Sequence, residues 1–125
     1  MQNNPHQVRA SHALTVADAV RKGDGEGDAI AGFPALIIRS GLLATLAFSL
    51  ERNKKGEPKR DAHKRIADAI AEHLAKLSPD ENLVAPENPT GDGLLRKLAT
   101  SDTAHLRRCT QEALEFLAYL KRFAR

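Results

Sequence analysis

The longest apolar run of the chain, residues 33–48, constrains the fold more than any other stretch of the sequence. Arg39 is the only charged residue in it. Apolar side chains recur at helical spacing on both sides of Gly41, and a glycine can adopt the positive φ that ends a helix in a left-handed cap. The run therefore predicts two helices that meet at a tight corner. Because both are apolar on more than one face, we expect them to be buried as the core of the domain.

Helical patterns also account for most of the remaining chain. Ala and Leu dominate the apolar residues, and no segment has the alternating, β-branched pattern of a strand. The sequence predicts an all-α fold, a single-domain bundle of about five to six helices over residues 1–125. The expected helices cover about 5–22, 28–40, 42–52, 58–77, 94–100 and 101–125. The expected irregular segments are a frayed end at 1–4, a glycine-rich linker at 23–27 and a flexible Pro/Gly/Asp-rich loop at 78–93.

Several residues have the chemistry of helix ends. Asn4 and Pro5 suit the N-cap and first position of the first helix, Asp28 can cap the second, and Ser101 can cap the last. Pro34 cannot donate a backbone hydrogen bond. Either the second helix is kinked there or a new helix begins at Pro34.

The composition and the chain ends limit the class of protein. The formal net charge is +3 and the pI about 9.2, which permits contact with nucleic acid without requiring it. Cys109 is the only cysteine, so no intrachain disulfide can form, and a reducing compartment fits. Neither a signal segment nor a transmembrane span is apparent, and we therefore expect a cytoplasmic protein with no membrane partner.

Residues that could carry out catalysis or bind a metal are few. His105 and Cys109 have the i, i+4 spacing of a metal-ligand pair, but no second pair accompanies them. Cys109 lies on the apolar arc of its helix, where a buried thiol resists ionisation and behaves as a small hydrophobe. We expect no catalytic residues, no metal and no cofactor.

Basic residues provide the main functional signal. Residues 54–65 contain six basic and two acidic residues, and further basic residues lie opposite the apolar arc of the last helix. Basic helix faces suit phosphate contacts that position a nucleic acid without reading its bases, whereas an ordinary solvated face is the alternative. The candidate RNA-binding residues are Lys54, Lys55, Lys59, Arg60, Lys64, Arg65, Arg107, Arg108, Lys121, Arg122 and Arg125.

Two stretches together resemble one protein family. The apolar run with the charged loop after it, residues 33–56, and the C-terminal helix, residues 110–124, are similar to the small all-helical subunit of type III-B (Cmr, RAMP-module) CRISPR effector complexes. The resemblance implies a compact helical bundle without catalysis of its own. It also implies that copies of the subunit stack along the duplex of guide RNA and target RNA, beside the other subunits, and hold the RNA backbone. The alternative is a helical scaffold that contacts only protein.

Overall fold

The computed structural model describes residues 4–21, 26–77 and 89–124. These residues form six α-helices, and their only β-type pairing is an isolated bridge between Arg52 and Pro58. The all-α prediction is confirmed. The helices are α1 (Pro5–Arg21), α2 (Glu26–Ser40), α3 (Leu42–Ser49), α4 (Asp61–Leu77), α5 (Gly91–Ala99) and α6 (Thr103–Phe123). The predictions for residues 1–3, for positions 22–25 of the linker, for positions 78–88 of the loop and for Arg125 lie outside the described residues.

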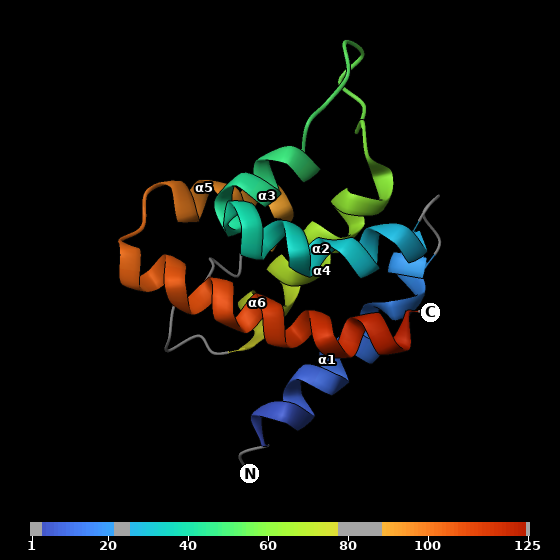
Figure 1. The fold of residues 1–125 in the computed structure, drawn as a ribbon, viewed down its shortest axis with the longest axis vertical. Helices are drawn as coiled ribbons and strands as arrows, with labels where there is room; N and C mark the ends of the chain where they lie inside the picture. The colour runs from blue at the N-terminus through green and yellow to red at the C-terminus, as the bar shows by residue number, and fades with distance from the viewer. Residues whose placement is uncertain (1–3, 22–25, 78–88, 125) are drawn as a thin grey trace.

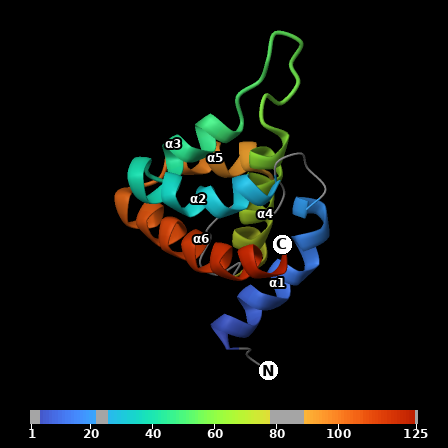
Figure 2. The same ribbon diagram turned by 45° about the vertical axis from the view of Figure 1, so that its right-hand side comes forward.

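Helix α4 lies at the centre of the bundle and contacts each of the other five helices (Figure 1). Three residues on one face of α4, Ile66, Ile70 and Leu74, are fully buried at 0% exposure, and Leu77 is partly buried. The long helix α6 and the paired helices α2 and α3 pack around it (Figure 2). The expectation that the apolar run at 33–48 forms the centre is therefore wrong in part, because that run supplies one wall of a core built on α4.

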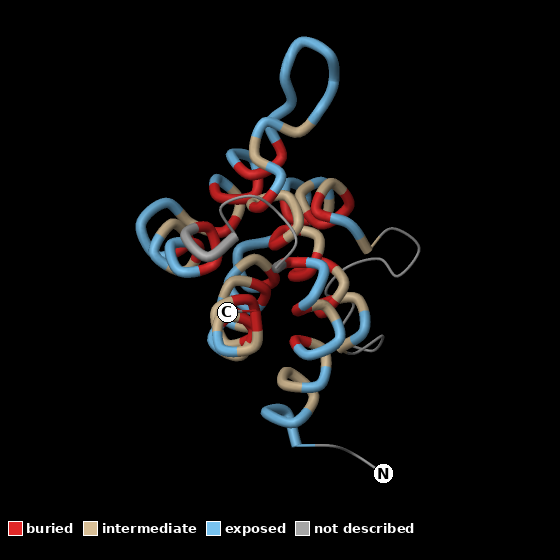
Figure 3. The backbone as a smooth tube through the Cα atoms, turned by 90° about the vertical axis from the view of Figure 1, so that its right-hand side faces the viewer, coloured by how far each residue is buried: buried red, intermediate tan, exposed pale blue. Residues whose placement is uncertain are grey.

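Helices α2 and α3 each have one buried and one exposed apolar face. Phe33, Ile37 and Leu46 lie in the core, but Ile38 is 75% exposed and Phe48 is 38% exposed. Burial on more than one face, as the sequence predicted, does not occur here, because α4 and α6 cover only the inner side of α2, and α4 and α5 only the inner side of α3. In Figure 3 the buried residues follow the inward faces of the helices.

Pro34 lies inside α2, which continues through it. The sequence left open whether a new helix begins at Pro34, and the structure shows that it does not. The carbonyl of Ile30, four residues earlier, consequently receives no helical hydrogen bond from position 34. Helix α2 begins at Glu26, so Asp28 lies within its first turn and the prediction that Asp28 precedes and caps this helix is wrong.

Gly41 forms the corner between α2 and α3. Its φ of 89° confirms the predicted positive φ, but its ψ of 158° lies outside the left-handed helical region of the expected cap. The Gly41 N–H donates to the Ile37 carbonyl at 2.7 Å, and the Gly41 carbonyl accepts from the Thr45 N–H and hydroxyl. The corner therefore ends one helix and starts the next at a single residue.

We expect Gly41→Ala to lower the free energy of unfolding by about 1–3 kcal/mol, because a side chain is strained at this φ and ψ. An added Cβ would meet no atom within 4 Å, so the effect comes from the backbone. Gly32→Ala is the matched control, since Gly32 lies inside α2 and is equally free of neighbours. The free energy of unfolding of this control should rise by about 0.5–1 kcal/mol. Urea unfolding of both variants measures the difference, and equal stabilities would contradict the assignment of strain to Gly41.

The remaining helix boundaries differ from the predicted ones by a few residues. Helix α3 ends at Ser49 rather than near 52, and α4 begins at Asp61 rather than near 58, because the intervening residues fold on one another. Helix α5 begins at Gly91, inside the segment expected to be a flexible loop, with the Thr90 hydroxyl accepting from the Gly93 N–H. Asp102, not Ser101, caps α6, and its carboxylate accepts from the His105 N–H at 2.7 Å.

Candidate functional site

Residues 50–60 form an arm that extends away from the helices in both views (Figures 1 and 2). Backbone hydrogen bonds join its two sides, from Asn53 N–H to the Glu57 carbonyl at 2.8 Å and from Lys59 N–H to the Glu51 carbonyl at 3.0 Å. The Asn53 side-chain oxygen accepts from two further N–H groups of the turn, those of Lys55 and Glu57. Gly56, with a φ of 80°, allows the chain to reverse. The arm is therefore a short, internally bonded hairpin.

Three of the candidate lysines, Lys54, Lys55 and Lys59, lie exposed on this arm. Within the part of the chain that the structure describes, no carboxylate forms an ion pair with any of them. The arm is pale blue in Figure 3, as expected for a segment whose residues 51–57 are all exposed. These ammonium groups are available for an anionic partner.

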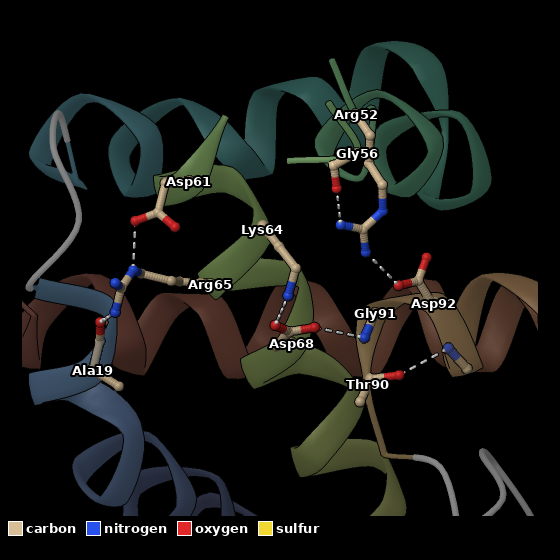
Figure 4. Close-up of polar contacts among 11 residues, drawn as sticks. Ala19, Arg52, Gly56, Asp61, Lys64, Arg65, Asp68, Thr90, Gly91 and Asp92 are labelled. Carbon is tan, nitrogen blue, oxygen red and sulfur yellow. Dashed lines mark hydrogen bonds and ion pairs between the residues drawn. The ribbon is translucent and has the colours of Figure 1, made fainter. Parts of the chain in front are cut away.

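The neighbouring candidates at the start of α4 are engaged within the molecule. Lys64 Nζ pairs with Asp68 at 2.8 Å, and Arg65 Nε pairs with Asp61 at 2.7 Å while its Nη1 donates to the Ala19 carbonyl on α1 (Figure 4). These side chains stabilise the fold, and only part of their donor capacity is left for a ligand.

Arg60 is held at the base of the arm. Its Nη1 donates to the Phe48 carbonyl at 2.9 Å and to the Glu51 carboxylate at 2.7 Å, and its guanidinium lies 3.7 Å from the centre of the Phe48 ring. On the other side of the arm, Arg52 donates to the Gly56 carbonyl and pairs with Asp92 of α5 at 3.3 Å (Figure 4). Arg52 and Arg60 thus connect the arm to the body, a role that their sequence spacing did not show.

The second predicted group lies along α6. Arg107, Arg108 and Arg122 are exposed, Lys121 is half-buried, and none of the four forms an ion pair with another described residue. Arg125 lies outside the described residues. Two exposed arginines outside the predicted set, Arg39 and Arg96, likewise form no ion pair in residues 4–21, 26–77 and 89–124. The basic surface therefore includes α2 and α5 as well as the arm and α6.

His105 and Cys109 lie together in the core, with Nε2 and Sγ 3.6 Å apart. Both residues are buried, and burial raises the pKa of the Cys109 thiol to about 11. In the described ranges, no group of three or more His, Cys, Asp or Glu side chains could hold a metal ion. The pair has the geometry of a core contact.

A polar cluster, hereafter the Arg9–Glu112 cluster, joins α1, α4 and α6. It consists of Arg9, His12, His73, Glu112 and Glu115. His73, which is fully buried and stacks on Phe116, forms a 2.8 Å hydrogen bond with Glu112 through Nε2 and a 2.7 Å contact with His12 through Nδ1. Arg9 forms a bidentate pair with Glu112 at 2.8 and 2.9 Å.

The electrostatics of this cluster favour an ionised Glu112. Burial opposes the charge of Glu112, but hydrogen bonds from His73 and Arg9 outweigh it and lower its pKa to about 2. Burial and the neighbouring His73 lower the pKa of His12. The sequence carried no signal for the cluster, because its contacts form only through helix packing between residues 39 to 106 positions apart.

No helix in the described part of the chain is long and apolar enough to cross a membrane.

Comparisons with known proteins relate the whole fold, rather than one cluster, to a family. The family model described as "CRISPR-associated protein (Cas_Cmr5)" matches residues 5–125. The structure is similar to the X-ray crystal structure of a CRISPR-associated Cmr5 family protein from Thermus thermophilus. The TM-score is 0.71 at 25% sequence identity, and the match covers 98% of this chain and 96% of that one. None of the curated proteins matches the chain.

Proposed function

Since the chain belongs to the Cmr5 family of CRISPR-associated proteins and is a small type III-B (Cmr) subunit, we propose that it holds the RNA backbone in the effector complex without catalysing a reaction. In this proposal several copies stack beside the other subunits along the duplex of guide RNA and target RNA. The proposal includes a cytoplasmic location and a part in antiviral defence.

The observation that carries the RNA-binding proposal is the state of the lysines on the arm. Lys54, Lys55 and Lys59 are exposed and form no ion pair with a described residue, on a hairpin that extends beyond the helices. Lysine ammonium groups bind phosphates as point charges, so such an arm suits contact with a nucleic-acid backbone rather than with base edges. Arg107, Arg108, Lys121, Arg122 and Arg125 are proposed to contribute further phosphate contacts on α6.

We expect the triple variant Lys54→Ala, Lys55→Ala, Lys59→Ala to weaken target-RNA binding by the complex assembled with this variant. Each phosphate contact releases counterions, so the slope of log affinity against log salt should become shallower by about 2 for each copy that contacts RNA. Filter binding or fluorescence anisotropy over a range of salt concentrations measures this slope.

The matched control removes the same charge from residues that are paired within the molecule. Lys64→Ala, Arg65→Ala, Lys76→Ala takes away three cations whose carboxylate partners are Asp68, Asp61 and Glu72. If this control remains folded, as judged by its circular dichroism, and still lowers affinity and salt slope as much as the arm variant does, the effect is one of net charge and the proposed arm contact is wrong.

An exposed apolar side chain favours protein contact as a second candidate function. Ile38 is 75% exposed on the outer face of α2, next to the exposed Arg39. In a protein-only scaffold, such a face would bind a neighbouring subunit and the arm would bind acidic protein groups. Assembly without RNA distinguishes the two, because reversal of charge at Lys54, Lys55 and Lys59 would then prevent assembly in the absence of RNA.

A further inference from the structure

The proton positions in the Arg9–Glu112 cluster follow from its hydrogen bonds. Glu112 is ionised and can only accept, so the Nε2 atom of His73 carries a proton. The Nδ1 atoms of His73 and His12 lie 2.7 Å apart, which requires one proton between them. With both rings neutral, His12 donates from Nδ1 and His73 accepts.

The hydrogen-bonded pair of His12 and His73 can bind one additional proton, but a second proton breaks its hydrogen bond. If His73 becomes an imidazolium, its Nδ1–H donates to His12, whose proton then resides on Nε2, and Glu112 balances the charge. If both rings become imidazolium ions, two Nδ1–H groups face each other at 2.7 Å and no acceptor remains. Doubly protonated, the pair loses its hydrogen bond and places two like charges in contact.

The charged groups around the two rings do not relieve the repulsion between two protonated imidazoles. On α4, Glu72 and Lys76 also act on His12, but they pair with each other at 2.8 Å. On α6, Glu112 faces His73 and is also held by Arg9 of α1, and Glu115 pairs with the same Arg9 at 2.7 Å. Each carboxylate near the two rings thus already has a cationic partner.

The attachment of α1 depends strongly on these polar contacts. Its buried apolar residues are small, namely Ala13, Ala17 and Val20, and bury little apolar surface. Val16 packs against the core as a partly buried residue, and the other polar contacts that the described residues of α1 make with α4 and α6 are the hydrogen bond from Arg65 to the Ala19 carbonyl and that between His6 and the Tyr119 hydroxyl. Loss of the histidine pair therefore removes one of these few polar contacts and places two like charges between α1 and α4.

We propose that His12 and His73 form an acid-sensitive clasp, which holds α1 against α4 and α6 at neutral pH and releases it when both rings are protonated. Released, α1 exposes its apolar face and the buried surfaces of α4 and α6, while the rest of the bundle stays folded. The clasp is a conformational switch built into the fold and does not depend on RNA binding.

Native-state hydrogen exchange of the full chain tests the clasp. Between about pH 7.5 and about pH 5, after correction for intrinsic exchange rates, we expect protection of α1 amides to fall about tenfold or more relative to α4 amides. This pH window follows from the direction of the pKa shift of His12. The pKa of His12 is lowered in the fold, so the stability held by its neutral form is lost as pH falls below the ordinary value of 6.5. Glu112 stays ionised throughout this window.

Two variants separate the clasp from other titrations. His12→Asn retains a hydrogen-bonding group that does not titrate, and it should abolish the selective loss of α1 protection. His63→Asn removes a different histidine whose pKa burial also lowers and whose ring contacts are Phe33 of α2 and Phe48 of α3, and it should leave the loss unchanged. Unchanged α1 protection in the wild type, or the same loss in His12→Asn, would overturn the proposal.

A second measurement does not need a variant. Nitrogen-15 NMR of the wild-type histidines should show a protonated Nε2 on His73 and a protonated Nδ1 on His12 at neutral pH. If both rings become fully protonated while α1 stays protected, the clasp does not exist.

Discussion

Replacing Glu112 with alanine is expected to lower the free energy of unfolding by about 3 kcal/mol, among the largest effects of a single polar substitution in this chain. Glu112 lies 2.8 Å from both Arg9 and His73, and its side chain is only 13% exposed. Its removal leaves a guanidinium and a buried imidazole N–H without their main acceptor. Leaving such groups unpaired costs more than the pair itself contributes.

Glu115→Ala is the matched control, because Glu115 is a glutamate of the same helix that pairs with the same arginine. Its side chain is 43% exposed, so its loss should cost no more than about 1 kcal/mol. Chemical denaturation at neutral pH compares the two variants. Equal losses of stability in the two variants would show that the burial of Glu112 does not increase its contribution to stability.

Acid should produce the same destabilisation in the unmodified chain. The pKa of Glu112 falls from an ordinary 4.5 to about 2 in the fold, so its contribution to stability is complete above about pH 4.5. That contribution is lost as the pH falls toward 2, where the folded protein also takes up the proton. The Glu112→Ala variant should therefore have a flatter stability profile between these values.

Ile37→Ala is expected to lower the free energy of unfolding by about 2–5 kcal/mol, whereas Ile38→Ala should change it by less than about 0.5 kcal/mol. The two isoleucines are neighbours in α2, but Ile37 is 2% exposed and Ile38 is 75% exposed. Truncation of Ile37 removes buried methyl groups and leaves a cavity in the core. Truncation of Ile38 removes groups that already contact water.

Thermal and chemical denaturation of these two variants tests the orientation of α2. A large loss at Ile38 would mean that the helix is rotated relative to the core. In the assembled complex, Ile38→Ala can still reduce binding to a protein neighbour, so stability and assembly should be measured separately.

Local pattern was sufficient to predict the helices, because their signals lie within a few residues of one another. The helical patterns located the six helices of the described residues to within a few positions, and Gly41 indicated the corner between α2 and α3. The boundary errors at 49–61 arise from the arm, whose backbone pairing between residues 51 and 59 overrides the preference of a proline such as Pro58 for the first position of a helix. The extent of burial was predicted less well, since periodicity does not show how many neighbours cover a helix.

The candidate site required tertiary information. In the sequence, Lys59 and Arg60 appear equivalent, but only Lys59 is free of an ion pair within the described ranges. The partners of Arg60 are Phe48 and Glu51, and their approach depends on how the arm folds back. The same holds for the Arg9–Glu112 cluster, whose members have no sequence relation that reveals it.

The bonding within the arm has a consequence for recognition. A loose loop loses conformational entropy when a ligand orders it, and that loss reduces affinity. Here the cross-arm hydrogen bonds, the Asn53 turn and the attachments through Arg52 and Arg60 restrict the backbone before any ligand arrives. The lysine ammonium groups are therefore presented on a preorganised support, and binding has only their own side-chain freedom to restrict.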